Sequence, residues 1–127
     1  MVQNQKLSTD WLFAFGKAEI AEDGIEGRAQ LDAFAADLLA GPPFEIVHVI
    51  GHSDRIGNAD ANVALSTRRA ASVRDYLVEK GVPADRITAV GRGSVEPVVE
   101  CEDQDRDALI ACLAPNRRVE IRVVPMR

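Results

Sequence analysis

The sequence predicts a layered α/β (α+β) domain in which helices pack on a four-stranded sheet. Strand-like and helix-like segments alternate along the 127 residues. Residues 44–50, FEIVHVI, are nearly all apolar and rich in β-branched side chains, as in a central strand. Residues 118–124 alternate apolar and charged side chains at the period of a strand. A chain that alternates strands with helices buries its apolar surface by packing the helices against a sheet.

The first half of the chain predicts strand, helix and strand. Residues 11–16, WLFAFG, are apolar and aromatic and end in glycine, which predicts a first strand before a loop over 17–27. Residues 30–40 predict a helix that ends at the Gly-Pro-Pro of 41–43. The strand over 44–50 follows, and its continuous apolar character predicts cover on both faces. The apolar positions of the helix are Leu31, Phe34, Ala35, Leu38 and Leu39.

The second half predicts a helix, a strand, a short helix and a last strand. A turn over 51–57 leads into a long helix from about 60 to 80, and Gly81 provides a natural stop. The apolar stripe of this helix is Val63, Ala70, Val73 and Leu77. The remaining elements are a strand over 86–90, a short helix over 107–113 and the strand over 118–124.

Length and composition predict one domain over residues 1–127, of which residues 1–7 are expected to be flexible. With 46% hydrophobic residues the chain can bury a core of its own. Acidic residues outnumber basic ones by 20 to 15 and the basic ones are scattered, which argues against nucleic acid as a partner. No segment approaches the roughly 18 apolar residues of a membrane span, and the first ten residues lack the apolar core of a signal peptide.

A carboxylate and a guanidinium stand close in sequence where the central strand leads into the long helix. Asp54 follows the carboxyl end of the strand, where ligands of α/β sheets bind, and Asn62 and Arg69 share one face of the helix. A guanidinium binds a carboxylate and an aspartate accepts from an ammonium, so together they suit an amino-acid zwitterion. A local alternative stays open, in which Asp54 accepts turn amides and Arg69 pairs with Asp54.

This segment follows the pattern D-x-x-G-x-x-x-x-N-x-x-L-S-x-x-R-A. The matching residues are Asp54, Gly57, Asn62, Leu65, Ser66, Arg69 and Ala70. The pattern resembles the OmpA-like peptidoglycan-binding domain family, over about residues 8–124. The resemblance implies non-covalent binding of peptidoglycan through the diaminopimelate of its stem peptide. Asp54 and Arg69 would hold the free amino-acid end of diaminopimelate, and Asn62 would add hydrogen bonds.

A second match to the same family is Asn116-Arg117-Arg118-Val-Glu-Ile at the start of the last strand. The resemblance implies that Arg117 reaches the stem peptide, whereas the local reading makes both arginines a solvated strand edge. Gly16 stands where many relatives have Asp or Asn, so a side-chain contact is lost there. The backbone amides of Gly16 and Lys17 are weaker candidates for lining the ligand.

The resemblance also implies a location and a parent protein. The domain would lie in the periplasm of a Gram-negative cell, excised from a longer outer-membrane protein with a barrel, and would anchor the outer membrane to the cell wall. A homodimer is compatible with this reading. The alternative on the same fold is a protein-interaction or oligomerisation module of the envelope, in which the cleft of Asp54 and Arg69 would be vestigial.

The two cysteines, Cys101 and Cys112, are too few for a structural zinc site by themselves. In a reducing compartment they would be free thiols. In an oxidising one they could close a loop and stabilise the fold by about 3 kcal/mol. The family resemblance favours the disulfide.

No catalytic or metal-binding constellation is predicted. His52, Ser53 and Asp54 supply the residue types of a hydrolase triad, but successive strand residues point to opposite faces. His48 and His52 are about 13 Å apart along a strand, too far to share a zinc ion. We therefore expect neither an enzyme nor a cofactor.

Overall fold

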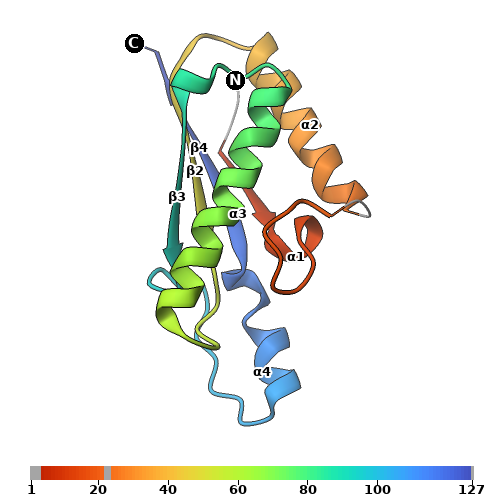
Figure 1. Ribbon diagram of the computed structural model, residues 1–127, viewed down its shortest axis with the longest axis vertical. Coiled ribbons are helices and arrows are strands. Elements are labelled where there is room, and N and C mark those ends of the chain that lie inside the picture. The colour runs from red at the N-terminus through yellow and green to blue at the C-terminus, as the bar shows by residue number, and fades with distance from the viewer. Residues whose placement is uncertain (1–3, 22–23, 127) are drawn as a thin grey trace.

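The computed structural model describes residues 4–21 and 24–126, and its described strands form one sheet in the order β1-β4-β2-β3 (Figure 1). Strands β2 and β3 are parallel, and β4 runs antiparallel to both of its neighbours, β1 and β2. The strands are β1 (Gln5–Ser8), β2 (Phe44–His52), β3 (Ile87–Gly93) and β4 (Arg118–Pro125). The predicted fold class, helices on a four-stranded sheet, is confirmed.

Helices α2 and α3 lie over the same face of the sheet, and α4 lies beyond one end of it (Figure 1). The side chain of Asn58 accepts from the amide of Ala61 and caps α3, and Asp105 caps α4 in the same way through Ala108. The helices are α1 (Thr9–Leu12), α2 (Ile25–Ala40), α3 (Ala59–Glu79) and α4 (Arg106–Cys112), with 3-10 turns at Ala84–Arg86 and Ala114–Asn116.

Two glycines on neighbouring strands let α3 pack closely against the sheet. Gly51 of β2 is paired in register with Gly91 of β3. A Cβ atom at Gly51 would lie 2.3 Å from the carbonyl oxygen of Ser66, and one at Gly91 would lie 2.2 Å from the amide of Thr67. The core that this packing encloses includes Leu31, Phe34, Leu38, Val47, Val49, Ala70, Val73, Leu77, Val119 and Ile121.

The first strand differs from the sequence prediction. Residues 11–16 form no strand; α1 ends at Leu12 and a loop follows. The first strand is instead β1 (Gln5–Ser8), at one edge of the sheet and mostly within the segment 1–7 that the sequence predicts to be flexible. Residues 1–3 lie outside the described residues. Leu12 and Phe13 are nevertheless buried. A short apolar run fits a buried helical turn as well as a strand, so periodicity alone cannot separate the two.

Three details of packing also differ from the prediction. The helices cover one face of β2, and Ile46 and His48 are partly exposed, so the prediction of cover on both faces is wrong. Val63 and Leu39, predicted to join the apolar stripes of their helices, are exposed.

No helix among residues 4–21 and 24–126 is long and apolar enough to cross a membrane.

Candidate functional site

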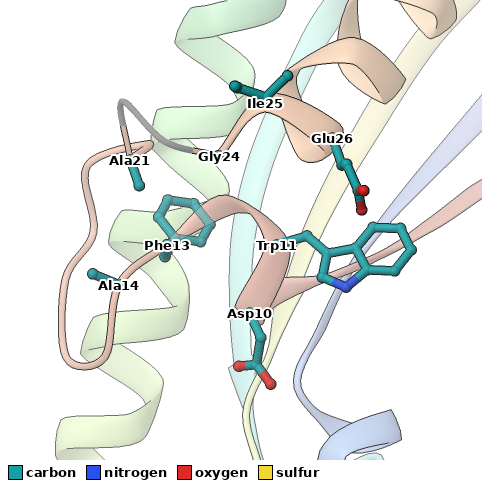
Figure 2. A pocket seen from close by; sticks show the side chains of 8 residues that line it. All are labelled: Asp10, Trp11, Phe13, Ala14, Ala21, Gly24, Ile25 and Glu26. Atoms are coloured by element: carbon teal, nitrogen blue, oxygen red, sulfur yellow. The ribbon is translucent and has the colours of Figure 1, made fainter.

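The site forms where β1 ends, β2 ends and β4 begins. In the sheet, Arg118 of β4 is paired with Ser8 of β1 on one side and with His52 of β2 on the other. Residues just beyond these three positions therefore meet at one end of the sheet. They are Asp10, Asp54 and Arg117, and α1 projects the carboxylate of Asp10 outward from the core (Figure 2).

Arg117 lies between two carboxylates. Its Nη1 donates to Oδ2 of Asp54 at 2.9 Å, and its Nη2 donates to Oδ2 of Asp10 at 3.0 Å. Nε also faces the Asp10 carboxylate, and Nη1 donates to the carbonyl oxygen of Ile110 at 3.0 Å. Partial burial by itself would lower the pKa of Arg117, but the hydrogen bonds that it donates to both aspartates, together with their charges, outweigh this and raise that pKa. The reading of Arg117 as a solvated strand edge is therefore wrong.

Asp54 has two tasks at the end of β2. Its Oδ1 accepts from the amide of Ile56 at 3.0 Å, which closes the turn, while Oδ2 binds Arg117. Asn62 supports the same turn, because its Nδ2 donates to the carbonyl oxygens of Ile56 at 3.0 Å and of Asp54 at 3.3 Å. Among the described residues, no hydrogen bond engages Oδ1 of Asn62. Asn62 thus holds the turn and keeps one acceptor available.

Arg69 reaches the same region from α3, without pairing directly with Asp54. Its Nε donates to the carbonyl oxygen of Lys17 at 2.8 Å, and its guanidinium lies 5.3 Å from the ring centre of Phe13. Burial lowers the pKa of Arg69, and the nearby charges of Asp10 and Asp54 partly offset this. A longer contact of 3.5 Å joins Nη2 to the carbonyl oxygen of Ala14. Within the described part of the chain, Nη1 of Arg69 makes no hydrogen bond.

The loop that carries Gly16 and Lys17 contacts Arg69 through its carbonyl oxygens, which accept from the guanidinium. The contribution expected of this loop is its backbone amides. The amide of Lys17 donates to the carbonyl oxygen of Ala14 at 3.0 Å, so this amide is engaged within the loop. Gly16 has a φ of 72°, in the left-handed region that favours glycine, and its amide is engaged by no hydrogen bond among the described residues. The amide of Gly16 therefore stays a candidate for lining the ligand.

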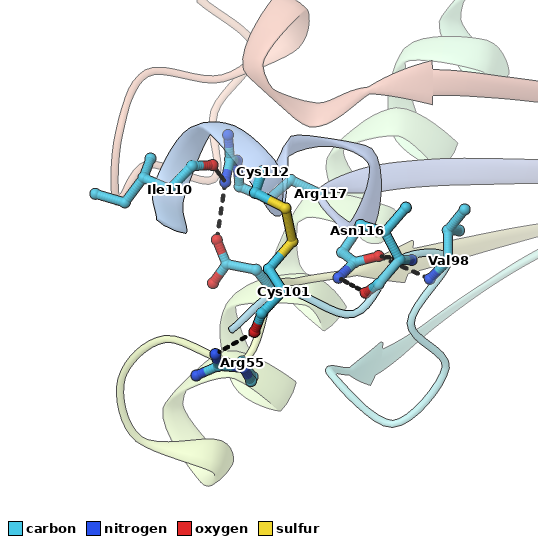
Figure 3. Close-up of a disulfide and its surroundings, with 9 residues drawn as sticks. Arg55, Val98, Cys101, Ile110, Cys112, Asn116 and Arg117 are labelled. Carbon is cyan, nitrogen blue, oxygen red and sulfur yellow. Dashed lines mark hydrogen bonds and ion pairs between the residues drawn. A yellow bond between two sulfur atoms is a disulfide. The ribbon is translucent and has the colours of Figure 1, made fainter. Parts of the chain in front are cut away.

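The predicted disulfide joins Cys101 to Cys112 (Figure 3). It ties the loop before α4 to the end of that helix. Arg55 donates to the carbonyl oxygen of Cys101 at 2.9 Å, and Arg117 donates to Ile110 within α4. The disulfide therefore fastens α4, and α4 in turn contacts Arg117, the side chain that binds Asp54.

The sequence prediction omits Asp10 and names Asn116 without giving it a role. Asp10 lies outside the family pattern, and the misplaced first strand concealed that it follows the end of β1. Asn116 is buried, and its Oδ1 accepts from the amides of Val98 and Val99. Its Nδ2 donates to the carbonyl oxygen of Val99, as a buried amide needs partners for its polar atoms. The signal that the sequence does carry is the place of Asn116 at the start of the second family match.

The residues of the dismissed triad do not converge. The ring of His52 is buried and lies 3.6 Å from Glu120, while the hydroxyl of Ser53 donates to the carbonyl oxygen of Asp54. What the site presents is a cluster of two guanidinium groups and two carboxylates. Such a cluster can bind a ligand that carries both an ammonium and a carboxylate.

Comparison with known proteins identifies the family of this chain. The OmpA family model matches residues 12–110. Outer membrane protein A of Yersinia pseudotuberculosis is 51% identical over 120 residues, which cover 92% of this chain and 33% of that protein. Outer membrane protein A of Escherichia fergusonii is 48% identical over 121 residues, with 92% of this chain and 49% of the relative covered. The chain thus spans a third to a half of these relatives.

Two solved structures resemble the fold. The cell wall anchor of the T6SS from Pseudomonas aeruginosa matches with a TM-score of 0.74 and 32% identity, over 97% of this chain and 81% of that one. The peptidoglycan-associated lipoprotein from Burkholderia pseudomallei matches with a TM-score of 0.72 and 26% identity, over 93% and 88%. The chain is homologous to the periplasmic C-terminal domain of outer membrane protein A, which confirms the predicted location. This chain belongs to the OmpA family.

Proposed function

We propose that this chain binds peptidoglycan without chemistry, by gripping the free amino-acid end of diaminopimelate in the stem peptide. The observation that carries the proposal is the ion pair of Asp54 with Arg117 at one end of the sheet, close enough to Arg69 for the charge of Asp54 to act on it. The names of the two similar structures, a cell wall anchor and a peptidoglycan-associated lipoprotein, support the same ligand class.

The proposed binding site, called the grip below, consists of Asp54, Asn62, Arg69 and Arg117. It binds the carboxylate of the zwitterion on one side and the ammonium on the other. The ligand carboxylate binds Arg69, whose Nη1 is not engaged by the described residues, and the ammonium donates to Asp54. Asn62 adds its free acceptor, and Arg117 contributes a second guanidinium to the carboxylate side. No bond is made or broken, so the function is adhesion rather than catalysis.

The wider role follows from the relatives. We infer that residues 1–127 act as one periplasmic domain of a longer outer-membrane protein that contains a barrel, and that this domain ties the outer membrane to the cell wall. The identity to outer membrane protein A over 92% of this chain supports this inference. The length of those relatives fits a parent two to three times longer.

Calorimetric titration with diaminopimelate and with a stem peptide tests the proposal. We expect saturable binding by the wild-type chain and its loss in Arg69→Ala. Arg68→Ala is the matched control, because Arg68 is the exposed neighbour of Arg69 on α3. Equal binding by wild type and Arg69→Ala would refute the site. No binding by a folded wild type would favour the protein-interaction module instead.

A further inference from the structure

A shallow hollow lies beside the proposed grip, between α1 and the start of α2. Its volume is about 570 Å³. The side chains that line it include Asp10, Trp11, Phe13, Ala14, Ile25 and Glu26 (Figure 2). Neither the family pattern nor the proposed grip assigns a role to this hollow.

The hollow combines an exposed aromatic ring with hydrogen-bond acceptors. Trp11 is 47% exposed and Ile25 is 69% exposed, although both are large apolar side chains. In Figure 2 the carboxylates of Asp10 and Glu26 lie on either side of the indole of Trp11. An indole offers an apolar face to the C–H groups of a ring, and carboxylates accept hydrogen bonds from hydroxyl groups. A sugar ring presents both of these features at once.

The hollow is continuous with the grip through one residue. The carboxylate of Asp10 lines the hollow and also accepts from Arg117, which in turn binds Asp54. A ligand held by Asp54 and Arg69 therefore has its neighbouring groups within reach of the hollow. In peptidoglycan a short segment of the stem peptide joins diaminopimelate to the glycan strand, so this segment can bring a sugar to the hollow.

Charge distinguishes a sugar from the other parts of peptidoglycan. Of the described residues that line the hollow, none is basic and two are acidic, so the carboxylates of a stem peptide are disfavoured there. The charge of Asp10 is partly offset by Arg117, which it shares with Asp54, so the hollow is no strong site for a cation. An uncharged ring with hydroxyl groups fits this weakly acidic lining better than an anion or a cation does.

We propose that the hollow formed by Asp10, Trp11, Ile25 and Glu26 is a second subsite, which takes an N-acetylhexosamine ring of the glycan strand. This inference rests on the proposed function, because the grip on the stem peptide brings the sugar to the hollow. It predicts that the protein binds a sugar-linked stem peptide more tightly than the same peptide alone.

The test compares two probes on the full chain, a disaccharide tetrapeptide and the same tetrapeptide without sugars. We expect the first to bind about five- to tenfold more tightly, a gain typical of one aromatic contact. Trp11→Ala should remove this gain and leave the affinity for the free tetrapeptide unchanged. Leu39→Ala is the matched control, since Leu39 is equally exposed at 47% on the far part of α2. Trp11 is the only tryptophan, so its fluorescence should change with the sugar-linked probe and not with the tetrapeptide.

The outcomes separate this inference from the proposed function. Binding of both probes with equal affinity, or a sugar-dependent gain that survives in Trp11→Ala, would overturn the subsite while leaving the grip intact. Failure of the wild type to bind the free tetrapeptide would instead count against the grip. Self-association that Trp11→Ala abolishes, seen by sedimentation, would assign the hollow to a second copy of the chain and overturn the sugar subsite.

Discussion

At the scale of single residues, Arg117 links parts of the chain that are far apart in sequence. Its partners Asp10 and Asp54 precede it by 107 and 63 residues. The planar guanidinium can face both carboxylates at once because its donors point in fixed, different directions. A lysine has one ammonium centre and would serve one carboxylate at a time. We infer that Asp10 fixes the orientation in which Arg117 meets Asp54.

Asp10→Asn should therefore weaken binding of the stem peptide by about fivefold, the equivalent of about 1 kcal/mol. The amide keeps an acceptor for Arg117 but loses the charge that holds the guanidinium in place. Calorimetric titration measures the change. Asp107→Asn is a control with the same loss of charge, located in the exposed first turn of α4. An equal loss in both variants would show that overall charge, and not the contact with Arg117, is responsible.

The sequence could predict part of this site and not the rest. Asp54, Asn62 and Arg69 lie within one strand-turn-helix segment, so local spacing places them together. The contact of Arg117 with Asp10 depends on the register of β1 against β4, which no local pattern reveals. For the same reason the sequence could not show that Asp54 pairs with Arg117 rather than with Arg69.

At the scale of elements, α4 is held by specific links rather than by its own apolar packing. None of its seven residues is buried. Its links to the rest of the chain include the disulfide from Cys112 and the hydrogen bond from Arg117 to Ile110. The position of Ile110, and with it the support for Arg117, thus depends on Cys101 and Cys112.

Removing the disulfide should affect both stability and binding. In the double variant Cys101→Ser and Cys112→Ser, we expect the free energy of unfolding to fall by about 3 kcal/mol, because the unfolded chain regains the freedom of an open loop. Binding of the stem peptide should also weaken, since Ile110 no longer anchors Arg117. Urea unfolding and calorimetry measure the two effects. Unchanged affinity in a folded double variant would show that Arg117 needs no support from α4.

Helices and strands were predictable from sequence to different degrees. The stripe of α3 and the apolar run of β2 extend over enough residues to predict a helix and a strand, although not every side chain in them is buried. Strand β1 has four residues, QKLS, of which Leu7 is the buried one, and its pairing with β4 defines it. A strand this short carries too little pattern to be recognised without its partner.

At the scale of the whole molecule, a row of charged groups covers part of the sheet face opposite α2 and α3. Glu120 accepts from Arg118 at 2.7 Å and from Arg122 at 2.9 Å, and it lies 3.6 Å from His52. Burial lowers the pKa of His52 and the charge of Arg118 adds to this, against the opposing effect of Glu120. Burial alone would raise the pKa of Glu120, but the hydrogen bonds from Arg118 and Arg122 reverse the direction and lower it.

The lowered pKa values of His52 and Glu120 both predict that the folded chain loses stability as the pH falls. His52 resists a proton in the folded chain, so its contribution is complete above its ordinary pKa of 6.5 and is lost as the pH falls below that value. Glu120 contributes above its ordinary pKa of 4.5 and loses its contribution at lower pH. A proton NMR titration should find the midpoint of the His52 ring below its ordinary pKa of 6.5. A midpoint above 6.5 would contradict the prediction, as would thermal melting temperatures that do not fall between pH 7 and pH 5.

The pairing of β1 with β4 also determines how the chain carries a mechanical load. β1 runs from Gln5 towards the site, and its hydrogen bonds to β4 stand across the strand direction. A pull that enters at Gln5 and is resisted by a ligand at Asp54 and Arg117 acts along the strands. It therefore shears the bonds between Gln5–Ser8 and their partners together, instead of peeling them apart one by one.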